Sequence, residues 1–269
     1  AVSADSSTVY AGGSFTNIGG QARNYIAALD AVAGTVAAWN PNSNNFVLTL
    51  AVSGANIYAA GTFTNIGGSA RNYIAALDAG TAVATAWDPN ADLPVFSLAV
   101  SGSTLYAAGT FTNIGGQVRN RLAALDLASG APSSWNPNVS NGVINVVAVR
   151  SGTVYIGGTF TSVGGAVRNN VASLNGLTGS VTAWNPNPGN QVRSIAVLSA
   201  TVYIGGDFTI LGSDQVGYFA QFDLPALQFA SVSSDGSEGS SINLTVSLSV
   251  MNDFDVTVDY AVTGGTASA

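Results

Sequence analysis

A phrase of six residues, Phe-Thr-Asn-Ile-Gly-Gly, recurs through the chain and limits the folds that the chain can adopt. It is identical at three places, changes to Phe-Thr-Ser-Val-Gly-Gly at a fourth, and is reduced to Phe-Thr-Ile-Leu-Gly at a fifth. The phenylalanines that open the copies are 48 or 49 residues apart, at Phe15, Phe63, Phe111, Phe160 and Phe208. A period of roughly 40–50 residues is typical of repeat proteins, in which one unit cannot bury its apolar face alone. The sequence therefore predicts five copies of one small unit.

Tyrosine and tryptophan recur in step with this phrase. The repeated tyrosines are Tyr10, Tyr58, Tyr106, Tyr155 and Tyr203, and the repeated tryptophans are Trp39, Trp87, Trp135 and Trp184. Aromatic side chains remove roughly 150–250 Å² each from water and dominate the interfaces that they enter. We therefore expect the four tryptophans to be buried between neighbouring units, as structural anchors of the repeat.

An Arg-Asn pair also recurs, at one place in four of the units. The arginines are Arg23, Arg71, Arg119 and Arg168, and the fifth unit has Val216 at this place. Two interpretations are open. A ring of guanidinium groups would suit an acidic glycan or a partner carboxylate. A structural arginine would instead pair with the repeated Asp30, Asp78 and Asp126, or fasten a turn, and strict repetition favours this second interpretation.

In the second unit, four segments have the composition of short β-strands. The mostly apolar segment 46–53 is followed by 56–64, 72–78 and 83–87, with glycine-containing turns between them. Pro89 cannot donate to a strand ladder, so the Trp-x-Pro-Asn segment belongs at a strand end or in a loop. No segment shows the 3.6-residue period of a helix. The predicted fold is all-β, a five-repeat β-propeller with four-stranded blades, which fits better than a β-helix or a sandwich.

The composition excludes several classes of function. Charged residues make up only 8% of the chain, against roughly 25% in an ordinary soluble domain. The net charge of −7 argues against a nucleic-acid partner, and no apolar run approaches the roughly 20 residues of a membrane span. The chain has no Lys, His or Cys, so cysteine nucleophiles and thiolate metal sites are excluded. A surface of Ser, Thr, Asn and Gly suits an extracellular or cell-surface protein.

The order Val-Tyr-x-Gly-Gly-x-Phe-Thr, Gly-Gly, Arg-Asn, Ala-x-Leu-Asp and Trp-Asn-Pro resembles the delta-60 repeat family of bacterial propellers. It is also similar to the kelch-like repeats of fungal cell-surface polarity proteins. The resemblance covers residues 1–223. The repeats run near 1–45, 46–93, 94–141, 142–190 and 191–223. The resemblance implies a secreted or surface propeller of undefined activity.

Residues 28–39, from Ala-Leu-Asp to the tryptophan, are similar to the tryptophan-docking motif of quinoprotein dehydrogenases. In that family the tryptophan packs between adjacent blades, and the Asp and Gly shape the turn. The segment that ends at Trp184 matches the turn but has Asn175 in place of Asp. The motif is a packing device, so the resemblance implies structure and not catalysis.

Beyond a linker at 224–227 the composition changes, and residues 228–269 resemble the first half of a Calx-beta domain. That family is an immunoglobulin-like sandwich that often binds calcium, so the resemblance implies a partial sandwich. The acidic residues off the repeat are weak calcium candidates at Glu238, Asp253 and Asp255. Calcium takes several converging oxygen ligands. The same acids also suit the solvated side of an edge strand, and both interpretations stay open.

The sequence predicts a non-enzymatic extracellular protein, structural or adhesive, in a larger surface or matrix assembly such as a fibre. Its expected partners are other copies of itself, or parts of the same polypeptide, because the chain begins part-way into a repeat. We expect no cofactor, apart from calcium in the Calx-beta-like part. A carbohydrate-binding propeller is the alternative, with Tyr25 and Tyr73 as stacking residues. A quinoprotein-like or glycan-processing enzyme is the third interpretation, although the repeated residues include no catalytic set that differs between units.

Overall fold

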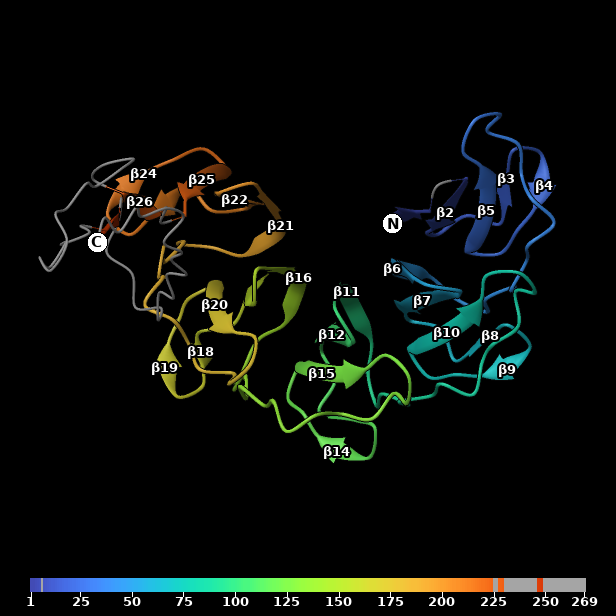
Figure 1. Cartoon of the computed structure of the whole chain (residues 1–269), viewed down its shortest axis with the longest axis horizontal. Helices are drawn as coiled ribbons and strands as arrows, with labels where there is room; N and C mark the ends of the chain where they lie inside the picture. The colour runs from blue at the N-terminus through green and yellow to red at the C-terminus, as the bar shows by residue number, and fades with distance from the viewer. Residues whose placement is uncertain (6, 225–226, 230–245, 249–269) are drawn as a thin grey trace, which may run out of the picture.

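The computed structural model describes residues 1–5, 7–224, 227–229 and 246–248. These residues form strands, turns and loops, and they contain no helix. Figure 1 shows five antiparallel sheets that follow one another along an arc, from the first sheet of the chain to the fifth. The all-β class predicted from the sequence is confirmed.

Each sheet has three strands, and the second strand in the chain lies in the centre. Sheet 1 contains β1 (Val2–Ala4), β2 (Thr8–Gly12) and β5 (Ile26–Asp30), and sheet 2 contains β6 (Val47–Ser53), β7 (Asn56–Gly61) and β10 (Ile74–Asp78). Sheet 3 contains β11 (Val95–Ser101), β12 (Thr104–Gly109) and β15 (Leu122–Asp126), and sheet 4 contains β16 (Ile144–Arg150), β17 (Thr153–Gly158) and β20 (Val171–Asn175). Sheet 5 contains β21 (Val192–Leu198), β22 (Thr201–Gly206) and β25 (Phe219–Asp223).

A small hairpin separates the second and third strands of every sheet. The five hairpins are β3–β4 (Asn17–Ile18, Gln21–Ala22), β8–β9 (Asn65–Ile66, Ser69–Ala70), β13–β14 (Asn113–Ile114, Gln117–Val118), β18–β19 (Ser162–Val163, Ala166–Val167) and β23–β24 (Ile210–Leu211, Asp214–Gln215). Their turns carry the repeated Gly-Gly pair, in which both glycines have positive φ in the first four units. Glycine adopts this left-handed conformation without a steric penalty.

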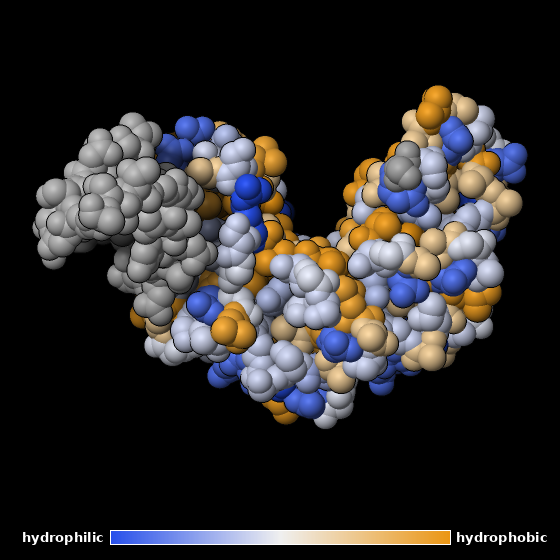
Figure 2. All heavy atoms as spheres, in the orientation of Figure 1, coloured by the Kyte–Doolittle hydropathy of each residue, from blue (hydrophilic) through white to orange (hydrophobic). Residues whose placement is uncertain are grey.

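The first strand of each sheet lies on the concave side of the arc, and the hairpins lie toward its convex edge (Figure 1). Neighbouring first strands contact one another along the arc. The space-filling view shows a broad concavity between sheet 1 and sheet 5, with hydrophobic residues along much of its floor (Figure 2).

In place of the predicted fourth strand, sheets 1 to 4 have a single β-bridge. The bridges join Leu29 to Val36, Leu77 to Ala84, Leu125 to Pro132 and Leu174 to Val181. The tryptophan follows three residues after each bridge, and the chain turns there into the space between two sheets. A proline comes two residues later and has no N–H to donate. A longer ladder therefore does not form.

The core lies in the seams between neighbouring sheets. In the seam between sheets 2 and 3, Ile74 and Ala76 lie in one cluster with Leu105 and Ala107, and all four side chains are 0% exposed. Burial of apolar surface contributes roughly 25 cal/mol per Å². The small alanines at the middle of each seam let the sheets approach closely.

A β-bulge interrupts the first strand of sheets 2 to 5. The register shifts by one residue near the start of β6, β11, β16 and β21. The residues at the shift are Leu48, Phe96, Asn145 and Arg193. A bulge leaves one residue unpaired and re-aims its side chain, so these four positions are free to differ from sheet to sheet.

Beyond sheet 5, β26 (Leu227–Phe229) pairs antiparallel with β27 (Val246–Leu248). The rest of the predicted Calx-beta-like part, and with it the predicted half sandwich, lies outside the described residues.

Candidate functional site

Each of the first three tryptophans joins its own sheet to the next. Trp87 lies edge-on to Tyr58 of sheet 2, with ring centroids 5.1 Å apart, and its Nε1 donates to the Asp126 carbonyl of sheet 3 at 3.1 Å. Trp39 and Trp135 make the same two contacts in the neighbouring seams. Trp39, Trp87 and Trp135 are 8%, 6% and 5% exposed, which confirms the burial predicted for them.

Trp184 differs from the other three, because it is only half-buried. Its ring lies edge-on to Tyr155 and to Phe222, at centroid distances of 5.6 and 5.4 Å. Phe222 occupies the place that a leucine fills in sheets 2 to 4. The predicted burial is therefore incomplete at the last seam.

The repeated arginines bind backbone carbonyls. Arg71 donates from Nη1 to the Ala70 carbonyl at 2.7 Å and from Nη2 to the Thr85 carbonyl at 2.6 Å. The other three arginines bind the equivalent carbonyls in their own units. Each guanidinium thus ties the small hairpin to the segment before the tryptophan. These are the bonds expected of a structural arginine, with carbonyls in place of the repeated aspartates as acceptors.

The asparagine after each arginine forms a second clip. Asn72 donates from Nδ2 to Oδ1 of Asn90 at 2.8 Å, and Asn90 belongs to the Trp-x-Pro-Asn segment of the same unit. The same bond recurs at 2.7 or 2.8 Å in the other three units that carry the pair. Asn90 has a φ of 48°, a conformation that asparagine tolerates better than most residues. The Arg-Asn pair and the Trp-x-Pro-Asn segment of one unit are therefore held together by a hydrogen bond between their asparagines.

The repeated aspartates shape the turn that follows the third strand. Oδ1 of Asp78 accepts the N–H groups of Gly80 and Thr81 at 3.0 and 2.7 Å, and Asp30 and Asp126 accept the equivalent pairs. Hydrogen bonds from the side chain and backbone of Thr81 lower the pKa of Asp78 below its usual range. Asn175 forms the same turn without a charge. The carboxylates are therefore turn acceptors in separate sheets and do not face one another across a cleft.

Two residues after each arginine position lies a residue with a left-handed backbone, and in sheets 1 to 4 its side chain contacts the seam with the next sheet. The residues are Tyr25, Tyr73, Arg121, Asn170 and Tyr218, with φ between 58° and 66°. Tyr25 lies edge-on to Phe46 at 5.5 Å, and Arg121 donates to the carbonyls of Gly142 and Val139 at 2.6 and 2.9 Å. The sequence did not reveal this role, because Tyr, Arg and Asn share no property that marks it. Tyr25 is therefore engaged in a seam contact.

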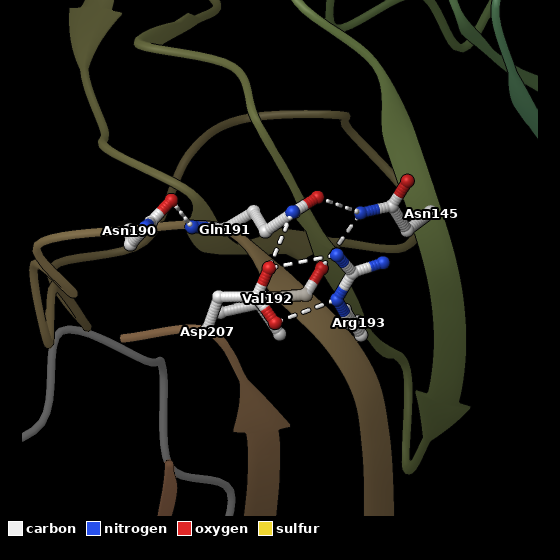
Figure 3. A network of polar contacts seen from close by, with 6 residues as sticks. All are labelled: Asn145, Asn190, Gln191, Val192, Arg193 and Asp207. Carbon is white, nitrogen blue, oxygen red and sulfur yellow. Dashed lines mark hydrogen bonds and ion pairs between the residues drawn. The ribbon is translucent and has the colours of Figure 1, made fainter. Parts of the chain in front are cut away.

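The bulged positions on the concave side are where the repeat loses its symmetry. They change from Leu48 and Phe96 to Asn145 and Arg193 along the chain. Arg193 binds Asp207 in a two-pronged ion pair, with Nε–Oδ1 and Nη2–Oδ2 distances of 2.7 Å. Figure 3 shows Gln191 donating to the same carboxylate, at 2.7 Å, and Asn145 reaching from β16 to the Val192 carbonyl of β21, at 3.0 Å.

This cluster, which we call the rim cluster (Asn145, Gln191, Arg193 and Asp207), is polar but poorly suited to acid–base chemistry. Hydrogen bonds from Arg193 and then Gln191 lower the pKa of Asp207, so its carboxylate stays ionised at neutral pH. A general acid needs a pKa near the working pH. The guanidinium and amide groups are instead suited to holding a polar ligand by hydrogen bonds.

Asp92 is a second position at which one unit differs from the others. Asn44 and Asn141 fill the equivalent place and accept the N–H groups of Thr64 and Thr161. Asp92 accepts four bonds from Thr112 and Asn113, at 2.6 to 3.0 Å. Partial burial raises the pKa of Asp92, but these hydrogen bonds outweigh it and lower the pKa to about 2.

A shallow pocket of about 310 Å³ lies on the outer side of the seam between sheets 1 and 2. Its lining includes Asn42, Asn65, Gly67 and Val83. These are framework residues of the repeat, with no carboxylate among the lining residues. Within the part of the chain that the structure describes, no three His, Cys, Asp or Glu side chains gather closely enough to hold a metal ion.

The predicted calcium residues Glu238, Asp253 and Asp255 lie outside the described residues. Among residues 1–5 and 7–224 and the two short strands after them, no helix is long and apolar enough to cross a membrane.

Comparison with known proteins supports the propeller class. The model of a β-propeller domain of unknown function, DUF5122, matches residues 104–127 and 150–181, which include parts of sheets 3 and 4. No curated protein matches the sequence.

The solved structures similar to this chain include propellers of low sequence identity. U3-55K matches with a TM-score of 0.52 and 13% identity over 75% of this chain and 55% of that chain. The WD40 domain of Neurospora crassa Pan2 matches with a TM-score of 0.51 and 10% identity over 74% of this chain and 56% of that chain. The chain thus spans little more than half the length of these two relatives. The likeness is one of fold alone, and it shows that the chain contains a β-propeller segment.

Proposed function

We propose that this chain is a non-enzymatic structural or adhesive module of a larger extracellular assembly. In this proposal the five sheets are blades of a propeller, residues 228–269 form part of an immunoglobulin-like sandwich of the Calx-beta kind, and calcium binds only there. The proposal rests on one observation: the repeated polar and aromatic residues serve the framework of the fold. The repeated arginines, the Arg-Asn asparagines and three of the tryptophans are hydrogen-bonded to the framework.

The carboxylates support the same proposal. Each repeated aspartate holds its own turn, in a different sheet, while hydrolysis of a glycoside needs two carboxylates that face each other across one cleft. The pKa of Asp207 is lowered by its bonds to Arg193 and Gln191, and the pKa of Asp78 by its bonds to Thr81. Such groups remain charged at neutral pH and do not donate protons there.

Carbohydrate binding is the second candidate function, and the rim cluster is the observation that favours it. It places a guanidinium, a carboxylate and two amides together on the concave side, where the repeat is not symmetric. Planar polar side chains of this kind bind sugar hydroxyls by paired hydrogen bonds. In the structure Tyr25 contacts Phe46, so the stacking role first expected of it is not favoured.

Two measurements test these functions. Electron microscopy and sedimentation of the full chain over a wide range of concentrations should show ordered higher assemblies if the role is structural. A strictly monomeric particle that adheres to no surface or matrix would contradict the structural role. A glycan array of the native chain and of Arg193→Ala tests the alternative, since binding that depends on Arg193 would favour the carbohydrate function.

A further inference from the structure

Sheets 2, 3 and 4 each pack one face against the preceding sheet in the chain. We call this face the leading face. On sheet 2 it includes Ile57, Ala59 and Leu77, which are all 0% exposed because sheet 1 covers them. Sheet 1 has Val9, Ala11 and Leu29 at these places, and all three are only half-buried. The leading face of sheet 1 therefore keeps the residue types of an internal seam, but no sheet among the described residues covers it.

Polar backbone groups on the leading face bind the Trp-x-Pro-Asn segment of the preceding unit. On sheet 2 the Asp78 carbonyl accepts the indole N–H of Trp39 at 3.0 Å, and the Gly67 N–H donates to the Pro41 carbonyl at 2.7 Å. The Thr64 N–H donates to Oδ1 of Asn44 at 2.9 Å. Sheet 3 binds the preceding segment through equivalent groups, with Asp92 in place of the asparagine.

Sheet 1 carries the same groups at Asp30, Gly19 and Thr16. Within the described residues, the Asp30 carbonyl accepts the Gly34 N–H but no indole, and neither the Thr16 nor the Gly19 N–H donates a hydrogen bond. Gly34 points to the same conclusion. A Cβ built on Gly130 would lie 3.2 Å from the indole nitrogen of the preceding tryptophan, whereas one built on Gly34 meets nothing within 4 Å.

Sheet 5, at the opposite end of the arc, does not present a face complementary to the leading face of sheet 1. In sheets 1 to 4, the face that covers the next sheet has a small residue at its middle, and each of these residues is at most 2% exposed: Ala28, Ala76, Ala124 and Ser173. Sheet 5 has Gln221 at this place, and beside it Phe219, 57% exposed, where sheet 2 has the buried Ile74. Gln221 and the ring of Phe219 are too large for a seam of the same spacing. A second copy of the chain is thus a poor occupant for the leading face of sheet 1.

We propose that the leading face of sheet 1 docks another unit of this same repeat, led by its Trp-x-Pro-Asn segment. The indole donates to the Asp30 carbonyl, the Gly19 N–H donates to the proline carbonyl, and the asparagine that follows accepts the Thr16 N–H. This docking deepens the structural role proposed above and rests on it. Its test measures folding alone, so it can fail or succeed independently of any adhesive activity.

A tandem copy of residues 1–48 placed directly ahead of Ala1 in the full chain tests the docking. Ala1 falls at the register position of Thr49, because Ser3 and Ala51 pair with Tyr10 and Tyr58, so the copy keeps the period. We expect a single cooperative urea transition with a higher midpoint than the native chain. We also expect blue-shifted emission from the added tryptophan. An early separate transition, or an unchanged midpoint, would overturn the proposal.

Two controls sharpen the result. The same copy with its own Trp39→Ala should lose most of the gain in midpoint, because the indole bond and its packing are removed. A copy of residues 176–223 inserted after Asp223 adds a unit at the other end, and should give a smaller gain. Equal gains at both ends would overturn the specificity of the leading face. Concentration-dependent dimerisation of the native chain that Val9→Glu on the leading face abolishes would also overturn the proposal, since a second copy would then be the occupant.

Discussion

At the scale of single residues, the repeat uses charged groups as fixed hydrogen-bonding parts, and Asp92 shows this most clearly. At the equivalent places, Asn44 and Asn141 accept the backbone N–H hydrogen bond without carrying a charge. The charge at this position is therefore not needed for the bonds, but it makes the unit sensitive to acid.

Asp92→Asn should reduce the loss of stability in acid. The folded pKa of Asp92 is about 2, below the ordinary value of 3.8, so its carboxylate stabilises the fold above pH 4 and loses this effect as the pH falls toward 2. The side chain is largely exposed, and screening limits the contribution to about 1 kcal/mol. Urea unfolding at pH 7 and pH 2.5 should show a smaller difference for the variant than for the native chain. An equal difference would contradict the lowered pKa.

The tryptophans should not be equivalent under substitution. Trp87→Ala removes a buried ring and an N–H bond between two sheets, and should lower the free energy of unfolding by about 3–5 kcal/mol. Trp184→Ala removes a half-buried ring and should cost less. Urea titration followed by circular dichroism measures both. Equal losses would mean that the last seam is as tightly packed as the others.

At the scale of the elements, the glycines at the ends of the central strands decide how closely the first strand can lie. A Cβ on Gly158 would overlap the carbonyl oxygen of Val143, and Gly61 and Gly109 would meet the equivalent carbonyls of Phe46 and Pro94. The backbone there has to move to admit any side chain. This crowding explains why a glycine ends the Ala-Gly or Gly-Gly pair before the phenylalanine in sheets 2 to 5.

Gly158→Ala should therefore destabilise the chain by about 1–3 kcal/mol, the usual cost of overpacking. Gly80→Ala is the matched control, because its Cβ would lie 3.4 Å from the nearest atom and its φ is not in the left-handed region. That variant should leave the melting temperature nearly unchanged. A tolerated Gly158→Ala, with full retention of the melting temperature, would show that β16 and β17 can separate at little cost.

The sequence predicted the elements well where their signal was periodic. The phenylalanines and tryptophans recur at the spacing of the three-stranded sheets, and Gly-Gly marks the hairpin turns of the first four sheets. The fourth strand was predicted from the β-branched composition of segments such as 83–87, but the tryptophan's turn into the seam leaves room for one bridge only.

The candidate site was less predictable, because its residues become neighbours only through the bulges. Asn145 and Arg193 are 48 residues apart, and neither belongs to the repeated motif. A bulged position in a strand has no characteristic residue type, so the sequence does not mark it. The left-handed conformation of Tyr25 and Arg121 was equally difficult to predict from the sequence, since bulky residues are rare in that conformation.

At the scale of the whole molecule, the arc is built from near-identical seams, and ion pairs are not the main contacts that stabilise them. Two salt bridges occur among the described residues, Arg71–Asp88 and Arg193–Asp207, and the second is on the surface. The repeated guanidinium groups bind carbonyl dipoles in partly buried places. Dissolved ions screen formal charges on a surface far more than partly buried contacts of this kind.

The seams should therefore hold across a wide range of ionic strength. With a net charge of −7, added salt weakens the repulsion among surface carboxylates, so the melting temperature should stay level or rise slightly between 0.05 and 1 M sodium chloride. Thermal unfolding at several salt concentrations measures this, and a steep fall would show that surface ion pairs hold the arc. A chain fastened in this way would keep its shape in fresh water and in brine alike.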